Sequence, residues 1–108
     1  MRLQTTESVT IGHPDKLCDQ ISDTILDNYL ACDPHARTAV ETLASSHGVT
    51  VAGEINSTAV LNDEQIERIV RAVIRDVGYT RDNGYDPETS PVRVELTKQS
   101  PEIANAVN

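Results

Sequence analysis

Apolar residues recur every three or four positions over residues 14–30, which is the spacing of one face of an α-helix. Pro14 suits a first helical turn, and Asp33 followed by Pro34 ends the run. The pattern therefore predicts a helix over residues 14–30. Its apolar face is formed by Leu17, Cys18, Ile21, Ile25, Leu26, Tyr29 and Leu30.

A second helix is predicted between Asn62 and Gly78. Asn62 and Gln65 have the spacing of a capping box, and Gly78 follows the last periodic residue. The intervening apolar stripe consists of Ile66, Ile69, Val70, Val73, Ile74 and Val77.

Strands are predicted at 37–45, 49–55 and 92–97, with a possible first strand over residues 2–6. The segment Ser46-His47-Gly48 separates two of them and favours an antiparallel hairpin. The order is then β-α-β-β-α-β. This order predicts an α+β fold with two helices packed on one mostly antiparallel sheet.

The length of 108 residues favours a single domain, whose core must rely on Val, Ile, Leu and Ala because Phe and Trp are absent. A formal net charge of −8 repels phosphate backbones and argues against nucleic-acid binding. The sequence has no apolar run of about 18 residues and no signal-peptide pattern, so we expect a cytoplasmic protein without a membrane partner. Cys18 and Cys32 are expected to be small core residues.

Residues 12–16 place His13, Asp15 and Lys16 at the start of the first predicted helix. Free N–H groups at a helix amino terminus attract phosphate. His13 can donate a hydrogen bond or a proton to a phosphate oxygen, and Asp15 can hold Mg²⁺. The alternative is an ordinary helix start, with an aspartate favoured by the helix dipole and a solvated lysine.

The predicted hairpin suggests a second site. If His47-Gly48 is a two-residue loop, Ser46 pairs with Val49, and Glu41 lies directly opposite Glu54. Like charges in that position are unfavourable, and a monovalent cation or the ammonium group of an amino acid between them would remove the penalty. A longer loop would shift the register, and solvated glutamates are the alternative interpretation.

Short blocks along almost the whole chain resemble, in order, the amino-terminal domain of S-adenosylmethionine synthetase, also called methionine adenosyltransferase. The blocks are TESV (6–9), GHPDK (12–16), DQISD (19–23), DP (33–34), AVET (39–42), GEI (53–55) and KQSPEI (98–103). Each block is weak alone, but their colinearity is specific.

The resemblance implies a transferase that joins the sulfur of methionine to C5′ of ATP and cleaves the released triphosphate to pyrophosphate and phosphate. ATP and methionine would be its substrates, and Mg²⁺ and K⁺ its cofactors. The functional residues implied by the resemblance are His13 at the ATP phosphates as a catalytic residue, Asp15 and Glu7 at magnesium, Glu41 at potassium, and Glu54 and Gln99 at methionine.

The resemblance also divides the chain into the amino-terminal domain, residues 1–100, and the start of a mobile active-site loop, residues 101–108. Ile11 departs from the family pattern, in which an acidic residue often precedes the glycine. Family members are several times longer and build their active sites across a dimer interface. We therefore expect a chain that is inactive alone and forms a homodimer or higher homo-oligomer through an exposed Val/Ile surface. The alternative is a standalone binding or regulatory module that pairs with a full-length synthetase.

Overall fold

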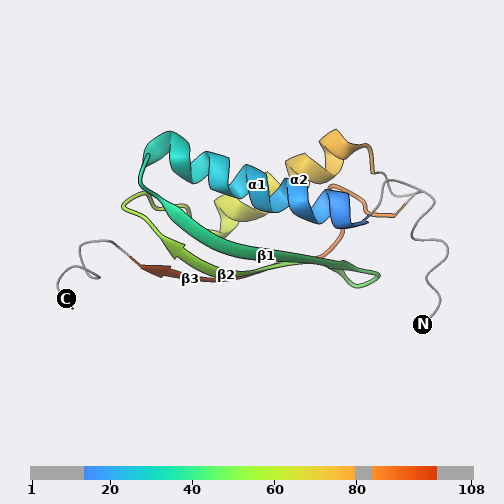
Figure 1. Ribbon diagram of the computed structural model, residues 1–108. Helices are drawn as coiled ribbons and strands as arrows, with labels where there is room; N and C mark the ends of the chain where they lie inside the picture. Colours follow the sequence, from blue (N-terminus) through green and yellow to red (C-terminus); the bar gives the residue numbers. More distant parts are fainter. Residues whose placement is uncertain (1–13, 80–83, 100–108) are drawn as a thin grey trace.

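The computed structural model of the chain describes residues 14–79 and 84–99. Its elements are α1 (Pro14–Cys32), β1 (Arg37–Ser45), β2 (Gly48–Asn56), α2 (Asp63–Val77) and β3 (Val92–Gln99). Figure 1 shows both helices on one face of the sheet, with no layer of the described residues on the other face. The predicted α+β fold is confirmed, whereas the strand over residues 2–6 and the loop over 101–108 lie outside the described residues.

The central strand of the three-stranded sheet is β2. It pairs antiparallel with β1 and parallel with β3. The parallel pairing follows from the connection, because α2 carries the chain back along the sheet between β2 and β3 (Figure 1). The sheet is therefore mixed.

The core lies between the two helices and the sheet. Its fully buried side chains come from the apolar faces predicted for both helices and from alternate positions of β2. They include Leu17, Ile21, Ile25 and Tyr29 of α1, Ile66, Val70 and Ile74 of α2, and Val51 of β2. The expectation of two core cysteines is wrong for Cys32, which is exposed, while Cys18 is partly buried. No helix in the described ranges has the length and apolar character to cross a bilayer.

The boundaries of α2 confirm the predicted caps. The Asn62 side chain accepts a hydrogen bond from the backbone N–H of Gln65, and the Gln65 side chain accepts one from the N–H of Asn62, each at 2.8 Å. Gly78 is the carboxyl-terminal cap. Because these bonds satisfy backbone groups that a helix end leaves open, local sequence alone specifies where this helix begins and ends.

The hairpin turns one residue earlier than predicted. Ser45 pairs with Gly48, so the loop is Ser46-His47. The Ser45 hydroxyl accepts a hydrogen bond from the backbone N–H of His47 at 3.1 Å and stabilises the turn at this position. The predicted pairing of Ser46 with Val49 is therefore wrong.

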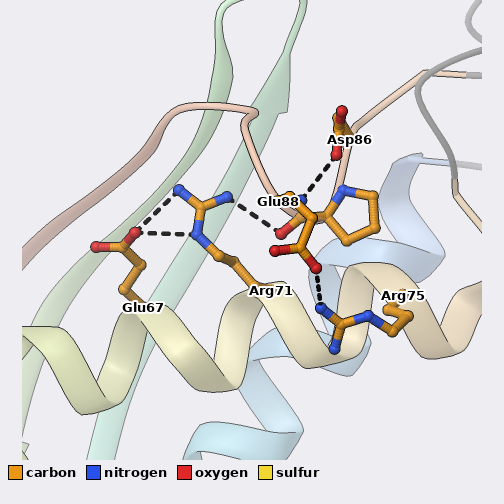
Figure 2. Close-up of polar contacts among 6 residues, drawn as sticks. Glu67, Arg71, Arg75, Asp86 and Glu88 are labelled. Atoms are coloured by element: carbon orange, nitrogen blue, oxygen red, sulfur yellow. Dashed lines mark hydrogen bonds and ion pairs between the residues drawn. The ribbon is translucent and has the colours of Figure 1, made fainter.

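The segment before β3 is fastened to α2 by arginine side chains (Figure 2). Arg71 donates hydrogen bonds to Glu67 at 2.9 Å and to the carbonyl of Pro87 at 3.2 Å. One turn further along, Arg75 pairs with Glu88 at 2.7 Å. These contacts hold the chain where it approaches the sheet, so they help to set where β3 begins.

Candidate functional site

The sheet face turned away from the helices, called the open face below, carries three of the predicted site residues. Side chains alternate between the two faces of a sheet, and the pairing of the strands places Glu41 of β1, Glu54 of β2 and Gln99 of β3 on this same face. All three residues are exposed. The fold therefore brings one predicted cation ligand and two predicted methionine ligands, each from a different strand, onto a single surface.

The small side chain of Ala52 lies in the acidic part of the open face. Ala52 is opposite Glu41 on β1 and opposite Glu95 on β3. Glu54, the next residue of β2 on this face, is opposite Ala39. Directly opposed side chains are about 5 Å apart at Cβ and diagonal ones about 7–8 Å apart. Glu41 and Glu54 are therefore diagonal neighbours, and the predicted direct pair is wrong, so the argument for a cation from two directly facing carboxylates no longer applies.

Glu95 is an acidic neighbour that the sequence reasoning did not assign to the site. Apolar residues alternate with polar ones over 92–97, which by itself puts Glu95 on the polar side of β3. What the sequence did not reveal is that β3 lies beside β2 with Glu95 across from Ala52. The open face consequently holds carboxylates on both sides of that alanine, and their negative potential is offset in part by Arg93, which lies opposite Thr50 on the same face.

Gln99 is held at the end of β3 by its backbone. It is opposite Asn56, and its carbonyl accepts a hydrogen bond from the N–H of Ser57 at 3.0 Å. The preceding residue, Lys98, projects from the other face and pairs with Asp63 of α2 at 2.9 Å. The main chain that carries the Gln99 side chain is thus held to β2 by this backbone hydrogen bond, while the exposed pair of Lys98 and Asp63 adds little.

Asp33 is a buried carboxylate between the end of α1 and the end of β2, with 7% of its surface exposed. Its Oδ2 atom accepts hydrogen bonds from the Ser57 hydroxyl at 2.8 Å and the Thr58 N–H at 3.0 Å, and its Oδ1 atom accepts one from the His35 N–H at 3.0 Å. The Ser57 hydroxyl, followed by the Thr58 and His35 N–H groups, holds the pKa of Asp33 below its ordinary value of 3.8. An ionised side chain therefore connects two elements at this corner.

The predicted phosphate and magnesium site lies largely beyond the described residues. Asp15 is exposed in the first turn of α1, whereas His13 and Glu7 are outside those residues. In the described ranges no three His, Cys, Asp or Glu side chains are placed to hold a metal ion together. Asp15 and Glu41 therefore each offer one carboxylate, and neither belongs to a complete metal site within the described part of the chain.

A groove of about 650 Å³ runs between α1 and β1 and reaches Glu41. Asp19 and Asp23 line its helix side, and the hydroxyl groups of Ser22 and Thr42 meet across it at 2.8 Å. Its described lining has carboxylates but no lysine or arginine. The groove therefore repels polyphosphate, and any anionic part of a ligand must approach from elsewhere.

Comparison with known proteins shows the family to which the chain is similar. Residues 1–101 match the family described as "S-adenosylmethionine synthetase, N-terminal domain". The chain is 50% identical over 108 residues to the S-adenosylmethionine synthase of Bifidobacterium adolescentis, an alignment that covers 99% of the chain and 26% of that protein. It is 50% identical over 107 residues to S-adenosylmethionine synthase 1 of Frankia casuarinae, covering 99% of the chain and 26% of the relative.

The S-adenosylmethionine synthase of Mycobacterium ulcerans is 48% identical over 108 residues, covering 99% of the chain and 27% of the relative. The chain thus spans about a quarter of the length of these relatives. Because the family match runs through nearly all of its residues, the chain belongs to the S-adenosylmethionine synthetase family and corresponds to its N-terminal domain.

Proposed function

We propose that this chain supplies the methionine-binding wall, and part of the ATP and metal sites, of an S-adenosylmethionine synthetase. In the complete reaction the methionine sulfur attacks C5′ of ATP, the C5′–O bond breaks, and the released triphosphate is hydrolysed to pyrophosphate and phosphate. The observation that supports this proposal is the placement of Glu41, Glu54 and Gln99 on one exposed face.

The open face suits the amino-acid substrate chemically. The Glu54 carboxylate can accept hydrogen bonds from the methionine ammonium group, and the Gln99 amide can donate to the methionine carboxylate. Glu41 and Glu95 add negative potential, which favours K⁺ at Glu41. The same potential stabilises the positive charge that develops on sulfur as the sulfonium forms.

The start of α1 is proposed to face the nucleotide. His13 would hydrogen-bond a phosphate oxygen of ATP, and Asp15 and Glu7 would hold Mg²⁺, which supplies positive charge beside the phosphates when bound. A helix amino terminus favours anions in the same region. The described residues support this part only through Asp15, whose carboxylate lies in the first turn of α1.

The isolated chain is proposed to be inactive because its acidic residues outnumber the cationic groups that could neutralise the departing triphosphate. It has 9 lysines and arginines against 17 acidic residues. Loss of preorganised charge stabilisation slows such reactions by orders of magnitude. Incubation of the purified chain with ATP, methionine, Mg²⁺ and K⁺ should yield no S-adenosylmethionine by mass spectrometry, and turnover in a preparation free of host synthetase would contradict the proposal.

Titration with L-methionine, followed by amide chemical shifts in NMR, tests the methionine wall. We expect shifts in β2 and β3 around Glu54 and Gln99, and we expect Glu54→Gln and Gln99→Ala to abolish them. Glu88→Gln is the charge-matched control, because Glu88 lies in the segment fastened to α2 and should leave the titration unchanged. Absence of shifts in the original chain at about 10 mM methionine would refute the methionine wall, since even a millimolar Kd gives near saturation there.

The same titration can test the proposed potassium site. Methionine should bind more tightly in KCl than in NaCl at equal ionic strength, because screening is then identical and only specific coordination differs. Glu41→Gln should remove that difference. A preference for K⁺ that survives Glu41→Gln would place potassium elsewhere.

We further propose that two or more copies of the chain associate through the open face. Leu43, on this face, is 72% exposed. The expected Val/Ile surface is not found on this face within the described residues. The large exposed apolar side chains of the described residues are Leu30, Leu43 and Val60, and of these only Leu43 belongs to a strand of the sheet. Sedimentation velocity should show association that Leu43→Lys weakens, and a monomer at high concentration would contradict this proposal.

A further inference from the structure

The end of β3 depends on a carboxylate that lies far from it in sequence. Asp33 and Ser57 are separated by 24 positions, and they are the two buried polar residues in the described part of the chain. The Ser57 hydroxyl donates to Asp33, while the Ser57 N–H donates to the carbonyl of Gln99. A single serine thus links the buried acid to the backbone of a proposed methionine ligand.

The Ser57 hydroxyl is fixed from two directions. It donates to Asp33 at 2.8 Å and accepts from the N–H of Ala59 at 2.9 Å. The Asp33 carboxylate also binds the N–H of Thr58, so the turn after β2 is held along its backbone as well as through the serine. Because the bond between Asp33 and Ser57 is buried and the neighbouring N–H groups are satisfied, the position of the Ser57 N–H is strongly determined.

Asp33 is itself anchored in α1 and in the approach to β1. Its N–H donates to the carbonyl of Tyr29 at 2.8 Å, and its carbonyl accepts from the N–H of Ala36 at 3.0 Å. The carboxylate therefore fixes the last residues of β2 and β3 relative to the end of α1. Those residues include Glu54, three positions before Ser57, and Gln99.

We infer that Asp33 is a positioning residue for methionine: through Ser57 it fixes the Gln99 backbone and sets the separation of Gln99 from Glu54. This inference rests on the proposed methionine wall. The Asp63–Lys98 pair at the same corner differs in kind, because the side chain of Asp63 is 68% exposed. An exposed ion pair of this type contributes little to rigidity.

Asp33→Asn removes the charge and one acceptor oxygen, and Ser57→Ala removes the link. With hydrogen exchange measured by NMR under conditions where each variant is fully folded, the Ser57 amide should exchange about tenfold faster in both, since its partner is less firmly held. The amide of Val70, in the core of α2, should not change. Ser57→Thr keeps the hydroxyl, so the amide at position 57 should exchange at the original rate in this variant.

Methionine affinity provides the second measurement. Asp33→Asn and Ser57→Ala should raise the methionine Kd at least about fivefold, the effect of one lost hydrogen bond. Asp63→Asn has the same charge change at the same corner and should leave the Kd near the original value. Val70→Ala lowers stability through the core and serves as the control for a general structural effect.

The outcomes separate the inference from the function on which it rests. If Asp33→Asn and Val70→Ala alter methionine affinity equally among folded molecules, Asp33 has only a structural role and the inference is wrong. If the original chain shows no methionine binding, the proposed wall fails, and faster exchange confined to Ser57 and its neighbours would still show that Asp33 positions the end of β3. Unchanged amide exchange at position 57 in both Ser57→Ala and Asp33→Asn would overturn the inference outright.

Discussion

Gly53 offers a direct test of how β1 and β2 fit together beside the proposed site. Its φ angle is +137°, and a Cβ atom at this position would lie 1.9 Å from the carbonyl oxygen of Ala39 and 3.1 Å from Cα of Val40. Only glycine adopts such a conformation readily. Gly53→Ala should therefore force β1 and β2 apart where they pair.

The expected loss combines two effects. A residue other than glycine at this φ costs about 1–3 kcal/mol. The backbone oxygen of Ala39 must also retreat by about 1.5 Å to reach ordinary contact distance, which disrupts hydrogen bonding between the strands at about 0.5–1.5 kcal/mol per bond. We expect a total loss of about 3–4 kcal/mol, a large part of the stability of a small domain.

Gly78→Ala is the matched control, because Gly78 also has a positive φ, +104°, but an added Cβ would meet nothing within 4 Å. Its cost should be limited to backbone strain of about 1–2 kcal/mol. Urea unfolding followed by circular dichroism measures both variants. Equal losses in the two variants would refute the proposed collision with Ala39. Gly53 also precedes Glu54, so the Gly53→Ala variant should bind methionine more weakly even when folded.

Three further predictions concern stability. The folded-state pKa of Asp33 is lowered, so its stabilising contribution is complete above the unfolded value near 3.8 and is lost as pH falls through the lower folded value. Asp33→Asn should therefore destabilise the chain at pH 7, and urea titrations should show this difference shrinking as pH falls below 3.8. The Tyr29 hydroxyl is buried and makes no hydrogen bond of good geometry among the described residues, although the backbone of Leu61 lies close to it. Tyr29→Phe should therefore change stability by at most about 1 kcal/mol, and a larger loss would show that the contact with Leu61 is a full hydrogen bond. Arg71→Ala should lower the free energy of unfolding by about 1–2 kcal/mol, because the Arg71 side chain is only 21% exposed and also binds a backbone carbonyl. Arg75→Ala removes an exposed pair and should lower it by at most about 1 kcal/mol. The reverse order of the two losses in thermal unfolding would contradict this explanation.

Local sequence determined the elements of this protein. Periodicity predicted both helices and three strands within a few residues, because side-chain spacing directly reports helical or extended backbone. The predicted boundaries of both β1 and α2 match the structure, and those of α2 have a local cause, since Asn62, Gln65 and Gly78 act on the helix ends next to them. The colinear motif blocks likewise identified the family, because they depend only on residue identity and order.

Tertiary structure decided how those elements meet. The turn position depended on the Ser45 hydroxyl, and a shift of one residue in the loop converted Glu41 and Glu54 from direct partners into diagonal neighbours. Glu95 joined the open face only through the pairing of β3 with β2. The bond between Asp33 and Ser57 also joins distant parts of the chain. Contacts of this kind depend on which of many possible pairings between distant segments is most stable. Periodicity reports only whether the local backbone is helical or extended and which side of the element a residue occupies.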